Sequence, residues 1–402
     1  MRLYLQFGWG MKKLVLDFAE EWKETDVVLS PRDISCKQLI AWSKEFRKTN
    51  VSCLFDPQCY FPKSNHKTLS QYDYWNNSMS TNLNSDLKYE SNLINSINNY
   101  NDIIGTKKFI IPAIMRKYDE EWMKKWKNDS EKLVEASLNI VGDKKLLLTL
   151  ALPSDLLSQK EDMIEKVIEI TEKLEVDGYY IIAEPPNGQY LVDNPLWLSN
   201  LLQLCAGLKL LNKEVIVGYA NQQLLCLSTA KVDSIASGTY LNVRKFSNKF
   251  EDLEGEIKRK SVWYYYPQAL SEYKISFLDV AYNNGILDEM KPGVEFNNEY
   301  IDLIFSGAMP TATTFNETLA FRHYLESLKK QASICSRDSF EETIAANEML
   351  LETAERRLEF LEKNGVYAQS RSFKDIIDVN RSAIQRLQKT RGFSLKLAWQ
   401  EM

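Results

Sequence analysis

Short apolar runs recur along the first 241 residues of the chain, and polar turn residues follow each of them. Most runs are rich in β-branched or aromatic residues, which is typical of buried strands. They occupy residues 3–7, 26–30, 51–55, 108–114, 146–152, 178–183, 214–220 and 232–241. Longer segments between them carry apolar residues at three- and four-residue intervals, which predicts amphipathic helices over residues 36–49, 119–141, 161–176 and 194–212.

The alternation of strands and helices predicts the fold class. Near-continuous apolar strands joined by amphipathic helices form a buried parallel sheet whose outer face the helices cover. Eight such units in about 240 residues favour an α/β fold of the (β/α)8 TIM barrel type. A doubly wound open sheet is the alternative, but it ordinarily carries a GxGxxG loop after its first strand, and the sequence here is FGWGMKK.

The same pattern divides the chain into three segments. Residues 1–245 form the barrel, with a long insertion at about 60–105 that is rich in Asn, Ser and Tyr and is expected to act as a lid or binding loop. Residues 246–325 form an irregular, aromatic-rich segment packed on the barrel. Residues 326–402 form a mainly helical C-terminal subdomain, in which residues 339–365 begin with a capping-box pattern and end at Gly365.

The barrel hypothesis also predicts where ligands bind, because active sites of this fold lie at the carboxyl ends of the strands. Asp56 and Gln58 follow the third apolar run in CLFDPQCY, and Glu184 follows the sixth, directly before two prolines. Carboxylates and amides pair with the edges of a base, aromatic rings stack on its faces, and arginines hold phosphate or carboxylate groups. The other candidate contacts at strand ends are Trp9, Arg32, Asp33, Arg116, Tyr219, Asn221, Tyr240 and Arg244.

Several of these residues also have a structural interpretation. Asp56 precedes a proline and is equally typical of a capped turn, and Asp33 fits the cap of the helix that begins near Cys36. Glu184 has little capping to do between a buried strand and two prolines, which favours a functional role. His323 lies within a predicted amphipathic helix and is expected to be structural.

The charge distribution limits the kinds of nucleic-acid contact. A formal net charge of −5 argues against a protein that coats nucleic acid through many phosphate contacts. Residues 366–402 carry seven basic and three acidic residues, which is typical of a solvated helix face or, alternatively, of a surface that guides phosphates. The aromatic run 262–267 follows KRK at 258–260, which indicates either a stacking platform for single-stranded nucleic acid or, more commonly, a buried edge strand.

The sequence predicts no metal site and no cofactor. Its six cysteines are scattered without a CxxC pair, and it has only two histidines. No window offers about 20 uninterrupted apolar residues, and the N-terminal stretch has no small-residue cleavage site. We therefore expect a cytoplasmic protein that does not enter a membrane.

The arrangement of these features resembles the tRNA-guanine transglycosylase family, including the branch that inserts deazaguanine bases into DNA. The resemblance rests on Asp56 in LFDPQ, on VIVGYANQQLLCLSTAKVDSIASG at 215–238, and on the helices after the barrel. It implies a barrel that exchanges a base through a covalent Asp–ribose intermediate, with Asp56 in the place of the family's base-recognising Asp. The family's zinc signature of three cysteines and a histidine is absent. Ala236 and Ser237 stand where its nucleophilic Asp is expected, and Asp233 comes three residues earlier.

The first functional hypothesis is a transglycosylase-like transferase that engages a nucleobase, tRNA or DNA and cleaves or exchanges an N-glycosidic bond. Such a protein would act in nucleic acid modification. The predicted roles are base reading by Asp56 and Gln58, reaction at the sugar carbon by Glu184 or Asp233, and guidance of phosphates by Arg244 with the basic tail.

Two alternatives stay open. A catalytically inactive barrel would serve as a binding or assembly subunit, with residues 246–402 contacting a protein partner or a second copy of the chain. A small-molecule glycosidase would use Asp56 and Glu184 as a carboxylate pair, because such enzymes place two carboxyl groups on either side of one bond.

Overall fold

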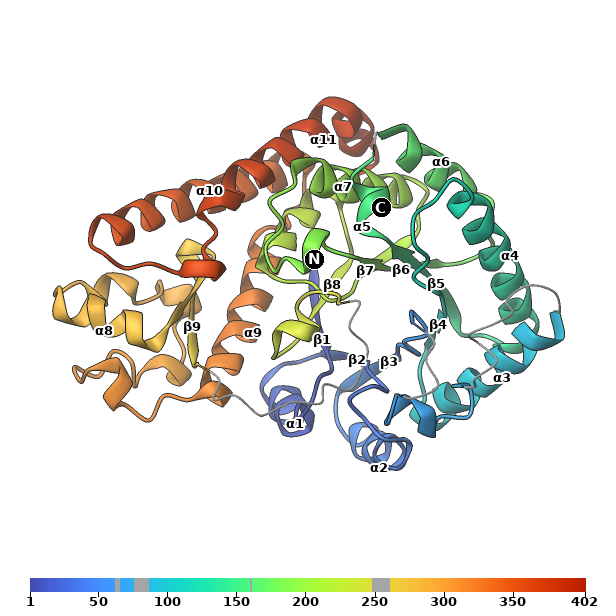
Figure 1. Cartoon of the computed structure of the whole chain (residues 1–402), viewed down its shortest axis with the longest axis horizontal. Helices are drawn as coiled ribbons and strands as arrows, with labels where there is room; N and C mark the ends of the chain where they lie inside the picture. The colour runs from blue at the N-terminus through green and yellow to red at the C-terminus, as the bar shows by residue number, and fades with distance from the viewer. Residues whose placement is uncertain (62–65, 76–86, 160, 248–260) are drawn as a thin grey trace.

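The computed structural model describes residues 1–61, 66–75, 87–159, 161–247 and 261–402. Within these ranges, eight parallel strands form one sheet in the order β3-β2-β1-β8-β7-β6-β5-β4 (Figure 1). The prediction of a (β/α)8 barrel is therefore confirmed. The strands are β1 (Arg2–Gln6), β2 (Thr25–Leu29), β3 (Val51–Phe55), β4 (Lys108–Ile111), β5 (Lys145–Leu152), β6 (Gly178–Ala183), β7 (Glu214–Val217) and β8 (Ser234–Ser237).

The barrel is nearly closed. Strand β1 pairs with both β2 and β8, so that Tyr4 lies opposite Asp26 on one side and Ala236 on the other. Strands β3 and β4 stand at the two ends of the sheet, and no hydrogen-bond ladder joins them in the part of the chain that the structure describes. The segments that follow these two strands meet at the mouth, where the Met115 N–H donates to the carbonyl oxygen of Tyr60 (2.9 Å).

Helices surround the sheet as the apolar periodicity predicts. They are α1 (Lys12–Glu21), α2 (Cys36–Phe46), α3 (Leu87–Ile104), α4 (Trp122–Ile140), α5 (Ser154–Leu157), α6 (Glu161–Thr171) and α7 (Pro195–Leu210), and the 3₁₀ segment η4 (Gln222–Ala230) follows β7.

The predicted insertion at 60–105 is shorter in the structure, because α3 takes up its second half and is the regular helix after β3. Residues 62–65 and 76–86, on which most of the predicted lid falls, lie outside the described residues. The described part of the connection is packed into the protein: Tyr72 and Tyr74 are buried and contact the ring of Phe55.

The described residues of the C-terminal part contain a hairpin, four α-helices and several short 3₁₀ segments. The hairpin strands are β9 (Trp263–Tyr266) and β10 (Ser271–Lys274), and the helices are α8 (Ile275–Asn283), α9 (Glu317–Ile334), α10 (Phe340–Lys363) and α11 (Ile377–Ala398). Tyr264, Tyr265 and Tyr266 are buried. The aromatic run is therefore a buried strand of this two-stranded hairpin and not an open stacking platform. The basic residues 258–260 lie outside the described residues.

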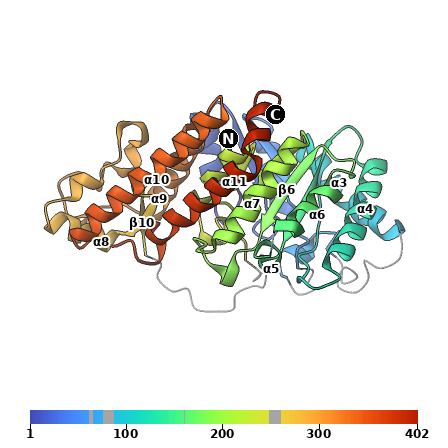
Figure 2. The same ribbon diagram turned by 90° about the horizontal axis from the view of Figure 1, so that it is seen from above.

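Two helices of this part complete the cover of the barrel. Helix α9 begins nine residues earlier than the predicted boundary at 326 and packs against β1, and its Arg322 forms an ion pair with Asp17 of α1. Helix α11 packs along the outer side of α7 (Figure 2). This contact explains the composition of α7, which is apolar on nearly all sides and buried along most of its length.

His323 and the basic tail both have structural roles. The neutral ring of His323 is buried between Tyr265 O (2.8 Å from Nε2) and Asn298 Nδ2 (3.1 Å from Nδ1), and burial lowers its pKa to about 4.

Within residues 366–402, six of the seven basic side chains form ion pairs, among them Arg386 with Glu161 and Arg391 with Glu165. The tail is therefore bound to the rest of the protein through its charges, and the structure does not present it as an open basic face. Among the helices that the structure describes, none combines the length and the apolar character needed to cross a membrane.

One buried ion cluster joins the barrel to the C-terminal part. Glu272 of β10 accepts through Oε2 from Arg244, which follows β8 (3.0 Å), and from Arg371, which precedes α11 (2.8 Å). The Arg244 and Glu272 side chains are each 3% exposed. The guanidinium of Arg244 lies 3.4 Å from the ring centroid of Tyr324 on α9. Four segments that are distant in the sequence thus meet at one carboxylate.

We expect Arg244→Met to lower the free energy of unfolding by about 3–5 kcal/mol, because removing one partner of a buried ion cluster leaves a carboxylate short of compensation. Arg357→Met, which removes a surface pair with Glu289, is the control and should cost less than about 1 kcal/mol. Denaturant unfolding followed by circular dichroism measures both. Equal losses in the two variants would contradict a special role for the cluster.

Candidate functional site

Asp56 lies at the centre of a buried polar network in the barrel mouth. Its Oδ1 accepts from the Gln58 N–H (2.9 Å) and from the Tyr60 hydroxyl (2.8 Å). Its Oδ2 lies 3.4 Å from the hydroxyl oxygens of Tyr180 and Tyr219. The side chain is fully enclosed, with 1% of the residue exposed. Asp56 therefore caps the turn that follows β3, and it also binds side chains from β6 and from the end of β7.

The backbone at two strand ends is shaped to support this network. Gln58 and Tyr219 both adopt left-handed φ angles (56° and 53°), which cost most residues of the order of 1 kcal/mol or more. Both polar atoms of the Gln58 amide form hydrogen bonds, since Nε2 donates to the Tyr219 hydroxyl (2.8 Å) and Oε1 accepts from the Arg32 N–H (2.8 Å). Gly218 is needed beside them, because a Cβ there would lie 2.5 Å from the Tyr180 hydroxyl oxygen.

Aromatic rings pack around this polar network. Phe246 is buried and meets Tyr60 and Tyr219 edge-on, with ring centroids 5.2 and 5.3 Å apart. It also stacks on Phe61 at 5.9 Å. The cavity beside Phe246 and Tyr219 measures only about 20 Å³, which is room for about one water molecule. The described residues thus already close the place where a barrel enzyme usually binds its substrate.

Burial raises the pKa of Asp56 to about 6, although the hydrogen bonds from Gln58 and Tyr60 oppose this shift. The same burial, together with the Asp56 charge, raises the pKa of Tyr180 and Tyr219 well above the usual value. An acid with a raised pKa in the folded state stabilises the protein most at low pH, and this contribution is lost as the pH rises through about 6.

We therefore expect the difference in unfolding free energy between the wild type and Asp56→Asn to change by about 2 kcal/mol between pH 4 and pH 7, in favour of the variant at the higher pH. Urea unfolding at several pH values measures the difference. Asp302→Asn, at an exposed carboxylate, is the control. A difference for Asp56→Asn that is constant over this range would mean that the carboxyl group is not held in a raised-pKa state.

A cleft of about 590 Å³ opens beside the closed mouth, between the barrel and the C-terminal part. This volume lies within the range of small-molecule sites, about 300–1,000 Å³. The cleft is bordered by the loops after β1 and β8, by the hairpin β9–β10, by α9, and by the segment before α11. The charged and aromatic residues of the lining include Trp9, Tyr240, Arg244, Glu272, Glu317 and Arg371.

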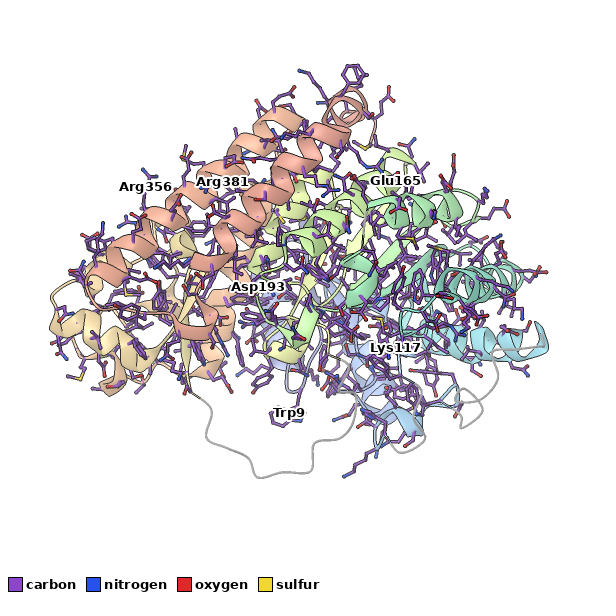
Figure 3. The ribbon with its side chains drawn as sticks, turned by 45° about the horizontal axis from the view of Figure 1, so that its top comes forward. Trp9, Lys117, Glu165, Asp193, Arg356 and Arg381 are labelled. Carbon is purple, nitrogen blue, oxygen red and sulfur yellow. The ribbon has the colours of Figure 1, made fainter. Side chains whose placement is uncertain are left out.

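The aromatic and charged groups of the cleft are arranged in pairs. The Tyr240 hydroxyl donates to Glu317 Oε2 (2.9 Å), and its ring meets Phe321 edge-on at 4.8 Å. The Arg371 guanidinium lies 3.9 Å from the ring centroid of Trp263. Trp9 differs from these, because its side chain projects from the body of the protein and is 71% exposed (Figure 3).

The structure brings only part of the predicted site residues together. Asp56, Gln58, Tyr219, Arg32 and Asp33 lie around the closed mouth, whereas Trp9, Tyr240 and Arg244 line the cleft. Asp33 does not cap α2, since Ser35 makes the capping box with Gln38. Asp33 instead lies 3.7 Å from Arg32 Nε, and burial raises its pKa.

Two predicted contacts are held in local structural roles. Glu184 accepts from the N–H of Ser154, the first residue of α5 (3.2 Å), so it does have a backbone group to cap. Asn221 caps η4 by accepting from the Gln223 N–H (2.9 Å), and its Nδ2 donates to the carbonyl oxygen of Tyr190 (2.7 Å).

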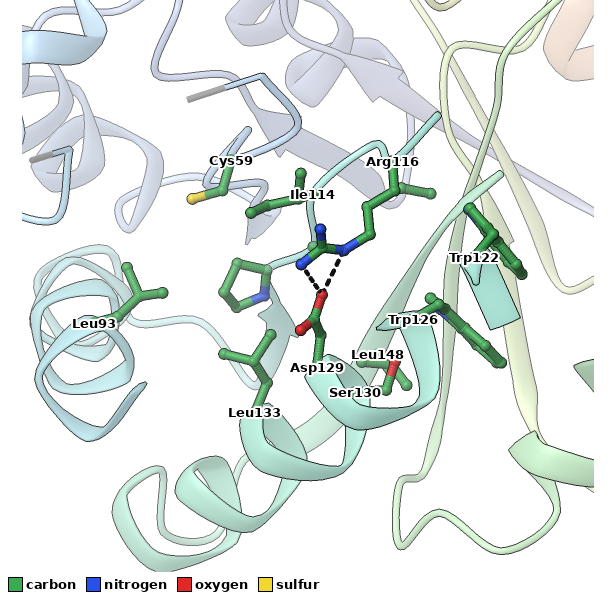
Figure 4. A pocket seen from close by; sticks show the side chains of 13 residues that line it. Cys59, Leu93, Ile114, Arg116, Trp122, Trp126, Asp129, Ser130, Leu133 and Leu148 are labelled. Carbon is green, nitrogen blue, oxygen red and sulfur yellow. Dashed lines mark hydrogen bonds and ion pairs between the residues drawn. The ribbon is translucent and has the colours of Figure 1, made fainter. Parts of the chain in front are cut away.

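Arg116 points away from the mouth centre. Its Nε and Nη2 both bind Asp129 Oδ2 on α4, at 2.7 and 2.6 Å (Figure 4). The apolar cavity beside this pair, lined by Trp122 and Trp126 among others, measures about 20 Å³. The ion pair fixes α4 to the segment after β4, and the cavity beside it has room for about one water molecule.

Asp233, which was predicted to react at the sugar carbon, does not lie at the barrel mouth. Asp233 directly precedes β8, and its carbonyl oxygen accepts from the N–H of Arg2 at the start of β1 (2.9 Å). It therefore lies at the amino end of the barrel, opposite to the mouth, where its carboxylate binds Lys209 (2.9 Å) and the Val215 N–H (2.8 Å). The resemblance to a family nucleophile on strand eight placed this residue by spacing alone.

Several residues of the mouth network and of the cleft were not predicted from the sequence. Tyr180 and Gln6 join the mouth network, with the Tyr180 hydroxyl donating to Gln6 Oε1 (3.1 Å). A polar residue inside each of two otherwise apolar strands was the available signal. Glu272, Glu317 and Arg371 carried no such signal, because they reach the cleft from elements outside the strand repeat.

The described residues contain no group of three or more His, Cys, Asp or Glu side chains that could hold a metal ion. The chain matches no protein-family model, and neither a curated protein nor a solved structure shows significant similarity to it. The resemblance to the transglycosylases therefore stays a prediction.

Proposed function

We propose that the protein binds a ligand that carries a nucleobase in the cleft beside the barrel mouth. The observation that carries the proposal is the exposed indole of Trp9 at the edge of a cleft of about 590 Å³ that also contains guanidinium and carboxylate groups. An exposed tryptophan ring offers a flat surface on which every base can stack. The polar side chains that line the cleft supply hydrogen-bond partners for the edge of the base.

The charges in the cleft favour a ligand of low net charge. Arg244 and Arg371 are balanced by Glu272 and Glu317, and most cations of the tail are engaged with carboxylates. A long phosphate backbone gains affinity by displacing counterions with many free cations, and the described surfaces of the cleft do not offer them. A base, a nucleoside or the exposed base of a larger molecule fits the cleft better than a duplex.

Trp9→Ala should weaken the binding of nucleosides about 5- to 150-fold, because stacking on an aromatic ring contributes about 1–3 kcal/mol per base. Isothermal titration calorimetry with the common nucleosides measures the affinities. Phe393→Ala is the control, since Phe393 is also a highly exposed ring but lies on α11, outside the cleft lining. Nucleoside affinities that Trp9→Ala leaves unchanged would contradict the proposal.

A second candidate function is cleavage of a glycosidic bond in the same cleft. The observation that favours it is the presence of two carboxylates from different elements, Glu272 on β10 and Glu317 at the start of α9. Paired carboxylates at a sugar let one group stabilise or attack the anomeric carbon while the other handles the proton of the leaving group. This pair takes the place of the predicted Asp56 and Glu184, because neither of those two residues lines the cleft.

Under this second candidate, Glu317→Gln should reduce the release of free base from a nucleoside by at least about 100-fold, because the amide cannot transfer a proton. Its nucleoside affinity should stay within about threefold of the wild type. Glu326→Gln, on the same helix and paired with Lys330, is the control. Chromatography of the released base measures the rate, and an equal rate in Glu317→Gln would rule out this chemistry.

A further inference from the structure

Two buried oxygen atoms in the lining of the cleft lack a hydrogen-bond partner among the described residues. They are Oε1 of Glu272 and Oγ1 of Thr239, and both residues are almost fully enclosed, at 2% and 4% exposure. A buried acceptor without a partner destabilises a protein. Other buried polar atoms of the described residues also lack a partner, but these two belong to residues that line the cleft, where a bound group would supply the missing donors.

The surrounding side chains explain why Glu272 cannot satisfy both of its oxygens internally. The guanidinium groups of Arg244 and Arg371 both bind Oε2, at 3.0 and 2.8 Å. Arg244 is held in this position because its Nε donates to the carbonyl oxygen of Gly238 (2.9 Å) and its plane lies on the ring of Tyr324. Oε1 is therefore left for another donor.

The residues that carry the two oxygens are connected through Arg244. Thr239 directly follows Gly238, whose carbonyl oxygen binds the same guanidinium that binds Glu272. A carboxylate oxygen only accepts hydrogen bonds, and a threonine hydroxyl accepts as readily as it donates. These two oxygens therefore offer acceptors in a cleft lining that also contains the guanidinium donors of Arg244 and Arg371.

We infer that the ligand is an amino-substituted heterocycle whose exocyclic amino group donates to Glu272 Oε1 and Thr239 Oγ1. An amino group carries two N–H donors, which is the number that the two oxygens require, and adenine and cytosine present such a group on one edge. A base that lacks the amino group leaves both oxygens unpaired. This inference rests on the proposed function, and it selects one class of base within it.

The test compares nucleosides that differ only in the amino group. Adenosine is paired with purine riboside, and cytidine with its 4-deamino analogue, and calorimetry gives the affinity of each for the full-length protein. We expect removal of the amino group to weaken binding at least about tenfold, because a site built around buried acceptors rejects an analogue that cannot pair with them.

Substitutions at Thr239 separate recognition from folding. Thr239→Val keeps the side-chain shape and removes an unpaired hydroxyl, so the melting temperature should stay the same or rise while the preference for adenosine over purine riboside falls about three- to tenfold. Thr239→Ser keeps the hydroxyl and should retain the preference. A second variant, Glu272→Gln, should reduce the preference further and also lower the melting temperature.

The outcomes separate a failure of the nucleobase proposal from a failure of the inference about the amino group. If adenosine and purine riboside bind equally and Trp9→Ala weakens both, the nucleobase proposal stands and the inference about the amino group is wrong. If no nucleoside binds, both fail together. A preference for adenosine that Thr239→Val leaves intact would also overturn the assignment of the two oxygens.

Discussion

The structure depends on one buried carboxylate that has to be shared. Glu272 comes from a hairpin outside the strand repeat, and its two arginine partners come from the end of the barrel and from the segment before the last helix. A carboxylate in such an enclosed place is tolerated only when cations compensate its lost hydration. The position of the hairpin, the loop after β8 and the start of α11 is therefore set by a single electrostatic requirement, and the cleft is the space that remains between these segments.

The barrel mouth shows the opposite solution. At the centre, Asp56 has its polar partners supplied by the protein itself, and the rings of Phe246, Tyr60 and Tyr219 exclude solvent. A polar network that is closed in this way stabilises the strand ends and fixes their relative position. The larger cleft lies to the side of this closed mouth, where the loops after β1 and β8 meet the C-terminal part.

The sequence predicted the fold closely and the site only in part. Each predicted strand overlaps an observed one, because a buried parallel strand needs a nearly continuous apolar run, as in residues 178–183. The roles of Asp56 and Gln58 were harder to predict, since their position at a strand end is local but their partners Tyr180 and Tyr219 come from other strands. Asp233 shows the same limit, because a shift of a few residues along β8 exchanges the two ends of the barrel. Glu272 and Arg371 could not be recognised at all, since their meeting is decided by tertiary packing.

The contact between α7 and α11 affects how the chain is made. Helix α7 is apolar on nearly all of its sides, and its outer cover is encoded far downstream, since α7 ends at Leu210 and α11 begins at Ile377. At a synthesis rate of 5–20 residues per second, the newly formed barrel carries this uncovered surface for roughly 10 to 30 s. An exposed apolar face of this kind is where chaperones bind and where neighbouring chains associate during translation. The last helix thus acts as the intramolecular cover that ends this vulnerable period.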